Sequence, residues 1–71
     1  MYSKVEELMK QRGINIVMLS QATGIPPTTI YDWKRRSKLE SQPVYLSAEN
    51  LQKVARYLGV PMEELMAEEQ A

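Results

Sequence analysis

The side chains that could do chemistry gather in one stretch of this sequence, from Thr28 to Lys38. Hydroxyl groups stand at its beginning, and four cations crowd into its last five residues, Lys34-Arg35-Arg36-Ser37-Lys38. Such groups bind phosphates and the edges of bases. The alternative is a solvated helix end, because cations near a helix C-terminus complement the helix dipole without any ligand. Whether this stretch binds a ligand or is only a solvated helix end depends on the helices that position it.

The residue types that most other kinds of site chemistry require are missing from this sequence. The sequence has no histidine and no cysteine, which removes imidazole bases, thiol nucleophiles, disulfides and zinc sites built on these residues. No two carboxylates are placed in an obvious cleft. We therefore expect no enzyme, no metal site and no cofactor.

The chain of 71 residues is long enough for one domain, with a core at about residues 3–66 and a polar tail at 67–71. No apolar run approaches the roughly 20 residues that span a membrane, and the first residues lack the layout of a signal peptide. We expect a cytoplasmic protein.

The net charge of zero conceals two unlike halves. Residues 1–46 carry seven basic and four acidic side chains, a net charge of +3, whereas residues 47–71 carry two basic and five acidic ones, a net charge of −3. The half that contains the cation cluster is thus the basic one.

The apolar residues recur with the period of an α-helix and never alternate as in a strand, which predicts an all-α fold. The expected helices are 3–12, 16–23, 27–36, 48–58 and 62–66. Residues 37–46 are mostly polar and read as a loop. The clearest apolar stripe is in the fourth helix: Leu51, Val54, Ala55 and Leu58.

The expected helix ends have local signals. Ser3 and Glu6 have the spacing of a capping box, and Asn15 and Ser47 are expected N-caps. Pro27 suits the first position of the third helix. Glycine, which tolerates the left-handed conformation, follows three of the helices, as Gly13, Gly24 and Gly59.

Two short helices joined by a glycine-centred turn, here at Gly24, describe a helix-turn-helix. With Thr28 at zero and about 100° per residue, Ile30 and Trp33 fall on the inward side of the third helix. The opposite sector, about 100° wide, is polar and partly cationic. It holds Thr28, Tyr31, Asp32 and Arg35. A recognition helix that enters the major groove of DNA needs such a face.

At this point the sequence resembles the lambda-repressor-like helix-turn-helix domains of the Xre type. The residues that carry the resemblance are Leu19, Gly24-Ile25, Ile30, Trp33, Leu51, Val54-Ala55, Leu58-Gly59-Val60 and Glu64-Leu65. The resemblance implies a compact five-helix domain that binds operator DNA as a dimer and usually represses transcription. Pro26 departs from the family, which usually has a capping Ser, Thr or Asn there.

Thr28 and Thr29 are the first candidates for DNA contact, because a threonine hydroxyl bonds to phosphates or base edges and its methyl group meets that of thymine. Thr29 lies nearer the inward side, so its alternative role is to cap or pack. Tyr31 is a candidate to donate to a phosphate, or else it packs half-buried against a neighbouring loop.

Asp32 either accepts from a cytosine amino group or orients Arg35 and Arg36, three and four residues further on, and we favour the second. Arg35 is expected to contact a guanine or a phosphate. Arg36 and Lys38 are expected to hold the DNA backbone, whereas Lys34 points away from the outward face and is expected not to contact DNA.

The leading hypothesis is a sequence-specific transcriptional regulator, a repressor of phage, plasmid or chromosomal bacterial origin, that binds a pseudo-palindromic operator as a homodimer. Tyr57, Met62 and Met66 either form the dimer contact or complete the core of the monomer. The alternative function is a protein-interaction module of the same fold, such as an antitoxin or anti-regulator, whose acidic C-terminal third binds a basic partner.

Overall fold

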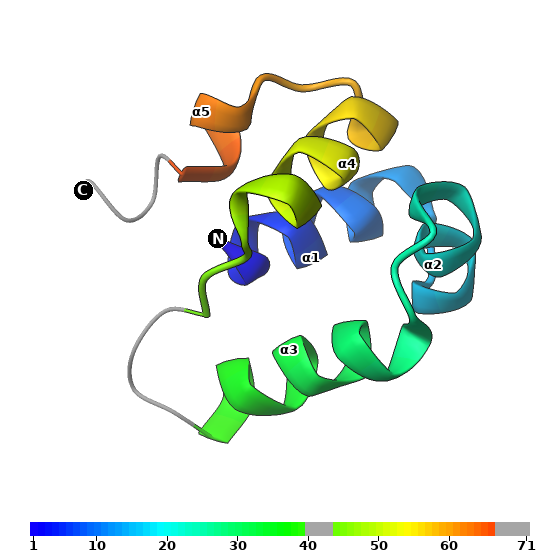
Figure 1. Ribbon diagram of the computed structural model, residues 1–71, viewed down its shortest axis with the longest axis vertical. Coiled ribbons are helices and arrows are strands. Elements are labelled where there is room, and N and C mark those ends of the chain that lie inside the picture. The colour runs from blue at the N-terminus through cyan, green and yellow to red at the C-terminus, as the bar shows by residue number, and fades with distance from the viewer. Residues whose placement is uncertain (40–43, 67–71) are drawn as a thin grey trace.

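The computed structural model describes residues 1–39 and 44–66, and Figure 1 shows the arrangement of their helices. These residues form five α-helices and no strand, as predicted: α1 Tyr2–Arg12, α2 Ile16–Thr23, α3 Pro27–Leu39, α4 Ala48–Leu58 and α5 Met62–Met66. The predicted tail 67–71 and residues 40–43 of the predicted loop lie outside the described residues.

Most of the predicted helix ends are confirmed. The Asn15 side chain accepts a hydrogen bond from the Met18 N–H (2.8 Å), and the Ser47 hydroxyl accepts one from the Asn50 N–H (3.2 Å). Gly13, Gly24 and Gly59 all have positive φ angles. These ends depend on neighbouring residues alone, and for that reason local signals found them.

The capping box predicted at Ser3 and Glu6 is wrong. Helix α1 begins one residue earlier, at Tyr2, and its N-cap is Met1, which makes no capping hydrogen bond through its side chain. The Tyr2 N–H instead donates to the carbonyl of Val44 (3.2 Å), and the Tyr2 side chain is buried. A contact with a distant segment therefore sets the start of this helix, and Ser3 is exposed within its first turn.

The predicted loop 37–46 begins too early, whereas residues 44–46 lie outside the helices as predicted. Helix α3 continues to Leu39, and the Ser37 hydroxyl donates to the Lys34 carbonyl (2.8 Å), so this polar side chain is satisfied within the helix. Val44 and Leu46 are buried in the core. The polar composition of the segment concealed these two apolar anchors.

All five helices contribute to one hydrophobic core. Its most deeply buried side chains are Tyr2, Val5, Leu19, Ile30, Val54 and Leu65. Helix α1 lies between α3 on one side and α4 and α5 on the other (Figure 1). Helix α3 packs chiefly on α1 and α2, at one edge of the molecule, which leaves a long side of it uncovered.

The residues considered for a dimer contact divide into two groups. Met62 and Met66 are partly buried and pack against the core of their own chain, in agreement with the second of the two predicted roles. The Tyr57 side chain, in the last turn of α4, remains 37% exposed. Of the three, Tyr57 is the one that offers a sizeable apolar surface.

Candidate nucleic-acid interface

The turn between α2 and α3 is held by side-chain hydroxyl groups as well as by Gly24. The Ser20 hydroxyl donates to the Ile25 carbonyl (2.6 Å). The Thr23 hydroxyl donates to the Leu19 carbonyl (2.7 Å) and lies 3.3 Å from the Ile25 N–H, which donates to it. With Ile25 buried, these bonds fix how α3 leaves α2. Neither hydroxyl was predicted from the sequence to have a role, although a Ser or Thr in the last turn before a helix-ending glycine indicates such a bond.

The inward side of α3 is formed by Ile30 and Trp33, as predicted. Ile30 is fully buried and Trp33 is 4% exposed. The Trp33 ring is tilted by 52° against that of Tyr2, with ring centroids 6.1 Å apart. This aromatic pair joins α3 to α1, so Trp33 is a core residue and its ring is not available to stack on a base.

The outward side of α3 presents the polar face that the helical spacing predicted. Thr28, Tyr31 and Arg35 are exposed, and Tyr31 keeps 52% of its surface accessible. Asp32 between them is intermediate. Thr29 is partly buried nearer the inward side, as expected from its spacing.

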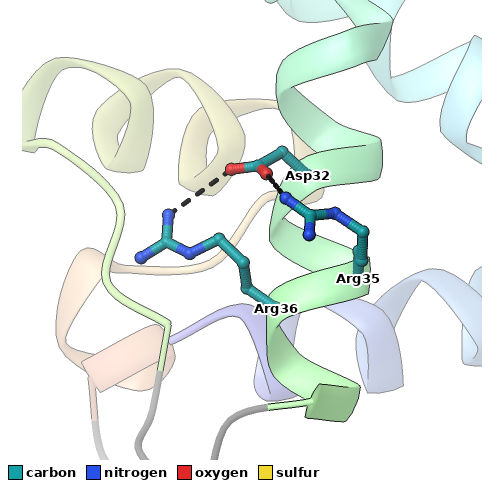
Figure 2. Close-up of polar contacts among 3 residues, drawn as sticks. All are labelled: Asp32, Arg35 and Arg36. Carbon is teal, nitrogen blue, oxygen red and sulfur yellow. Dashed lines mark hydrogen bonds and ion pairs between the residues drawn. The ribbon is translucent and has the colours of Figure 1, made fainter.

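Asp32 lies between two arginines on this face, as Figure 2 shows. Its carboxylate accepts from Arg35 Nη2 at 2.6 Å and from Arg36 Nη1 at 3.5 Å. The hydrogen bond from Arg35, joined by the weaker one from Arg36, lowers the pKa of the Asp32 carboxyl below its ordinary value. Asp32 therefore remains ionised near neutral pH and orients the two guanidinium groups, which is the role that the spacing favoured.

The first turn of α3 carries no side-chain cap. Pro26 precedes the helix and has no side-chain oxygen, while its carbonyl accepts from the Thr29 and Ile30 N–H groups. Within the described part of the chain, the N–H of Thr28 donates no hydrogen bond. A backbone donor and the Thr28 hydroxyl thus stand together at the positive end of the helix dipole.

The predicted cation cluster lies on the last turns of α3, where Lys38 is exposed and Arg36 is intermediate. Helix α3 carries four cations against Asp32, a net charge of +3. Helices α4 and α5, on the opposite side of the molecule, carry two cations against Glu49, Glu63 and Glu64, a net charge of −1. The described part of the molecule is therefore most basic along α3.

Two further features concern other kinds of site. Within residues 1–39 and 44–66, no three carboxylate, histidine or cysteine side chains are grouped so as to hold a metal ion. None of the described helices is long and apolar enough to cross a membrane.

The comparison with protein families agrees with this geometry. A family model described as a Cro/C1-type HTH DNA-binding domain, where HTH stands for helix-turn-helix, matches residues 4–70. The chain belongs to this family. No curated protein and no solved structure gives a significant match.

As a Cro/C1-type domain, the chain is a DNA-binding domain of the kind found in regulators, and this family is typically not enzymatic. The match agrees with the resemblance to lambda-repressor-like domains and with the five-helix fold. It also includes every residue that the sequence analysis selected for DNA contact, from Thr28 to Lys38.

Proposed function

We propose that this Cro/C1-type domain is a sequence-specific transcriptional repressor that reads the major groove of DNA with α3. The observation that carries the proposal is the outward face of α3. It has the exposed Thr28 hydroxyl at its uncapped N-terminal end and Arg35, oriented by Asp32, in its C-terminal half. The major groove of B-DNA is about 12 Å wide and admits an α-helix.

Each residue of this face has a proposed role that follows from its chemistry. Thr28 bonds to a base edge or a phosphate with its hydroxyl, and Thr29 supports the first turn beside it. Tyr31 donates to a phosphate. Asp32 presents Arg35 to a guanine edge, since a guanidinium group forms two parallel hydrogen bonds there.

Arg36 and Lys38 are proposed to bind the DNA backbone. Phosphate contacts of this kind give affinity and fix the orientation of the protein, but they carry no sequence information directly. Arg36 is held by the second oxygen of Asp32, so the same carboxylate would couple a base contact to a backbone contact.

A homodimer is proposed on the operator. Two recognition helices related by a twofold axis require half-sites about one helical turn, roughly 34–36 Å, apart, and hence a pseudo-palindromic sequence. The exposed Tyr57 ring on α4 is available for such a contact, because it lies on a helix remote from α3.

Selection of bound sequences from a random duplex pool tests this function. The expected result is a pseudo-palindromic consensus, which reports both base readout and dimeric binding. Binding without any enrichment would contradict sequence-specific readout, and an unpaired half-site would contradict the dimer.

Titration against random duplex at low salt separates this function from a protein-interaction module. Non-specific DNA binding has dissociation constants of about 10⁻⁴–10⁻⁶ M at physiological salt, and low salt tightens it. Retardation is therefore expected at tens of micromolar protein. Its absence would contradict DNA binding and favour an antitoxin-like or anti-regulator role.

A further inference from the structure

A groove of about 400 Å³ runs beside α3 on the side that faces α1 and the start of α2. Three lysines line it, Lys10 from α1 and Lys34 and Lys38 from α3, and we name it the lysine groove. The two α3 lysines are one helical turn apart, so they follow the same flank of that helix.

The charges of the lysine groove are only partly compensated. Glu6 is the acidic residue among its lining residues, which leaves a net charge of +2. The Glu6 carboxylate is 3.9 Å from Lys10 Nζ, and its negative charge adds to the effect of burial in raising the pKa of Tyr2. Neither Lys34 nor Lys38 forms an ion pair with any residue that the structure describes.

A second groove of about 470 Å³, between α2 and α4, provides a comparison. It also contains basic residues, Lys53 and Arg56, but its Glu49 lies 3.3 Å from Lys53. Its net charge is +1, and one of its two cations is neutralised at close range. The lysine groove is thus the more strongly cationic of the two, and it adjoins α3.

The lysine groove adjoins the outward face of α3. Tyr31 belongs to both, since it lies on the outward sector and also lines the groove. When a helix lies in the major groove, a sugar-phosphate backbone runs along each of its flanks. By the helical period Arg36 lies about 140° around α3 from Tyr31, so the two flanks of α3 carry separate sets of cations.

We infer that the lysine groove binds the phosphodiester backbone of the DNA strand that passes on the α1 side of α3. Lys34 and Lys10 supply phosphate contacts together with Lys38, and Tyr31 donates its hydroxyl at the boundary with the base-reading face. This inference rests on the proposed function and deepens it, because it adds Lys10 and Lys34, neither of which the sequence analysis assigned to DNA. Arg36 would then hold the opposite strand.

The test is the salt dependence of binding to a random-sequence duplex, measured for Lys34→Gln and for the matched control Lys53→Gln. Each variant loses one positive charge, but Lys53 lies in the second groove. One lost phosphate contact lowers the slope of log K against log salt by about 0.9. We expect this change for Lys34→Gln, about twice this change for the double variant Lys10→Gln with Lys34→Gln, and none for Lys53→Gln.

A further variant and a folding measurement keep the outcome interpretable. Lys34→Arg retains the charge and is expected to keep the wild-type slope, and thermal unfolding followed by circular dichroism verifies that each variant folds. Equal slopes for Lys34→Gln and Lys53→Gln would contradict phosphate binding by the lysine groove, but they would not contradict DNA binding by α3. A wild-type protein that binds no duplex would overturn the proposed function itself.

Discussion

Helices α3 and α4 are similar in length but are attached to the molecule in different ways. Helix α4 buries four side chains along one stripe, and its first turn is capped by Ser47. Helix α3 is two residues longer, with 13 against 11, yet it buries only Ile30 and Trp33 and has no side-chain cap. Helix α4 thus serves the core, whereas α3 is anchored at two points and offers most of its surface to a partner.

The charges of the two helices differ in the same sense. On α4 the ion pair between Glu49 and Lys53 is local and stays within the helix. Helix α3 carries four cations and one carboxylate, that of Asp32, which is bonded to Arg35 and Arg36 and orients them. An excess of charge on a helix with few buried side chains is typical of a binding element. The following predictions test this difference between α3 and α4.

The largest effect is expected from removing one of the two anchors of α3. Trp33→Ala should lower the free energy of unfolding by about 3–5 kcal/mol, because it deletes a large buried side chain and its contact with Tyr2. Urea denaturation measures this. Tyr31→Ala, on the exposed side of the same helix, is the control and should stay within about 0.5 kcal/mol of wild type. Similar costs for the two variants would contradict the division of α3 into an anchored and a free side.

The next effect concerns DNA binding and leaves the fold unchanged. Arg35→Ala should weaken operator binding by about 1–3 kcal/mol if Arg35 contacts a base, and it should relax specificity at that base. Arg56→Ala removes the same charge from α4 and should leave the specificity unchanged. Gel-shift titration against the selected operator and single-base variants compares them. Equal losses would mean that total charge matters and the position on α3 does not.

A smaller effect should distinguish the N-termini of the two helices. Ser47→Ala removes the cap of α4 and should cost about 1 kcal/mol of unfolding free energy. Thr28→Ala should leave stability nearly unchanged, since its exposed hydroxyl caps nothing in the described part of the chain, but should weaken DNA binding. Chemical denaturation and gel shift on both variants provide the comparison. A larger loss of stability for Thr28→Ala than for Ser47→Ala would contradict this prediction, because it would show that Thr28 caps α3.

The smallest effect is a pH dependence of the Asp32 contacts. The pKa of Asp32 is lower in the folded protein than its ordinary value, so the ionised carboxylate stabilises the folded state. This contribution is complete above the ordinary pKa and is lost as the pH falls through the lower, folded-state pKa. The difference in stability between wild type and Asp32→Asn should therefore shrink on acidification from about pH 6 to about pH 2. A difference that stays constant over this range would contradict the prediction.

Several features of this protein follow from its sequence because they depend on near neighbours. The stripe of α4, the caps Asn15 and Ser47, and the inward position of Trp33 all come from residues within about one or two turns of a helix. The same local geometry placed Asp32 within reach of Arg35 and Arg36. For these features, the helical period and the chemistry of each side chain are sufficient.

Other features were decided by the tertiary structure, because they depend on segments that are distant in the sequence. Helix α1 begins at Tyr2 since that residue meets Trp33 and the Val44 carbonyl. Val44 and Leu46 are buried although their neighbours in the sequence are polar, because their side chains pack against the core formed by the helices.

The lysine groove is the clearest case of this kind. Lys10 and Lys34 belong to different helices, and no local pattern indicates that they line one groove. The sequence by itself determined the helices, those of their ends that have local caps, and the faces that they present, since these arise from short-range interactions. Only the packing of α3 against α1 decided which cations share a surface, because that depends on the direction in which the α2–α3 turn sends the chain.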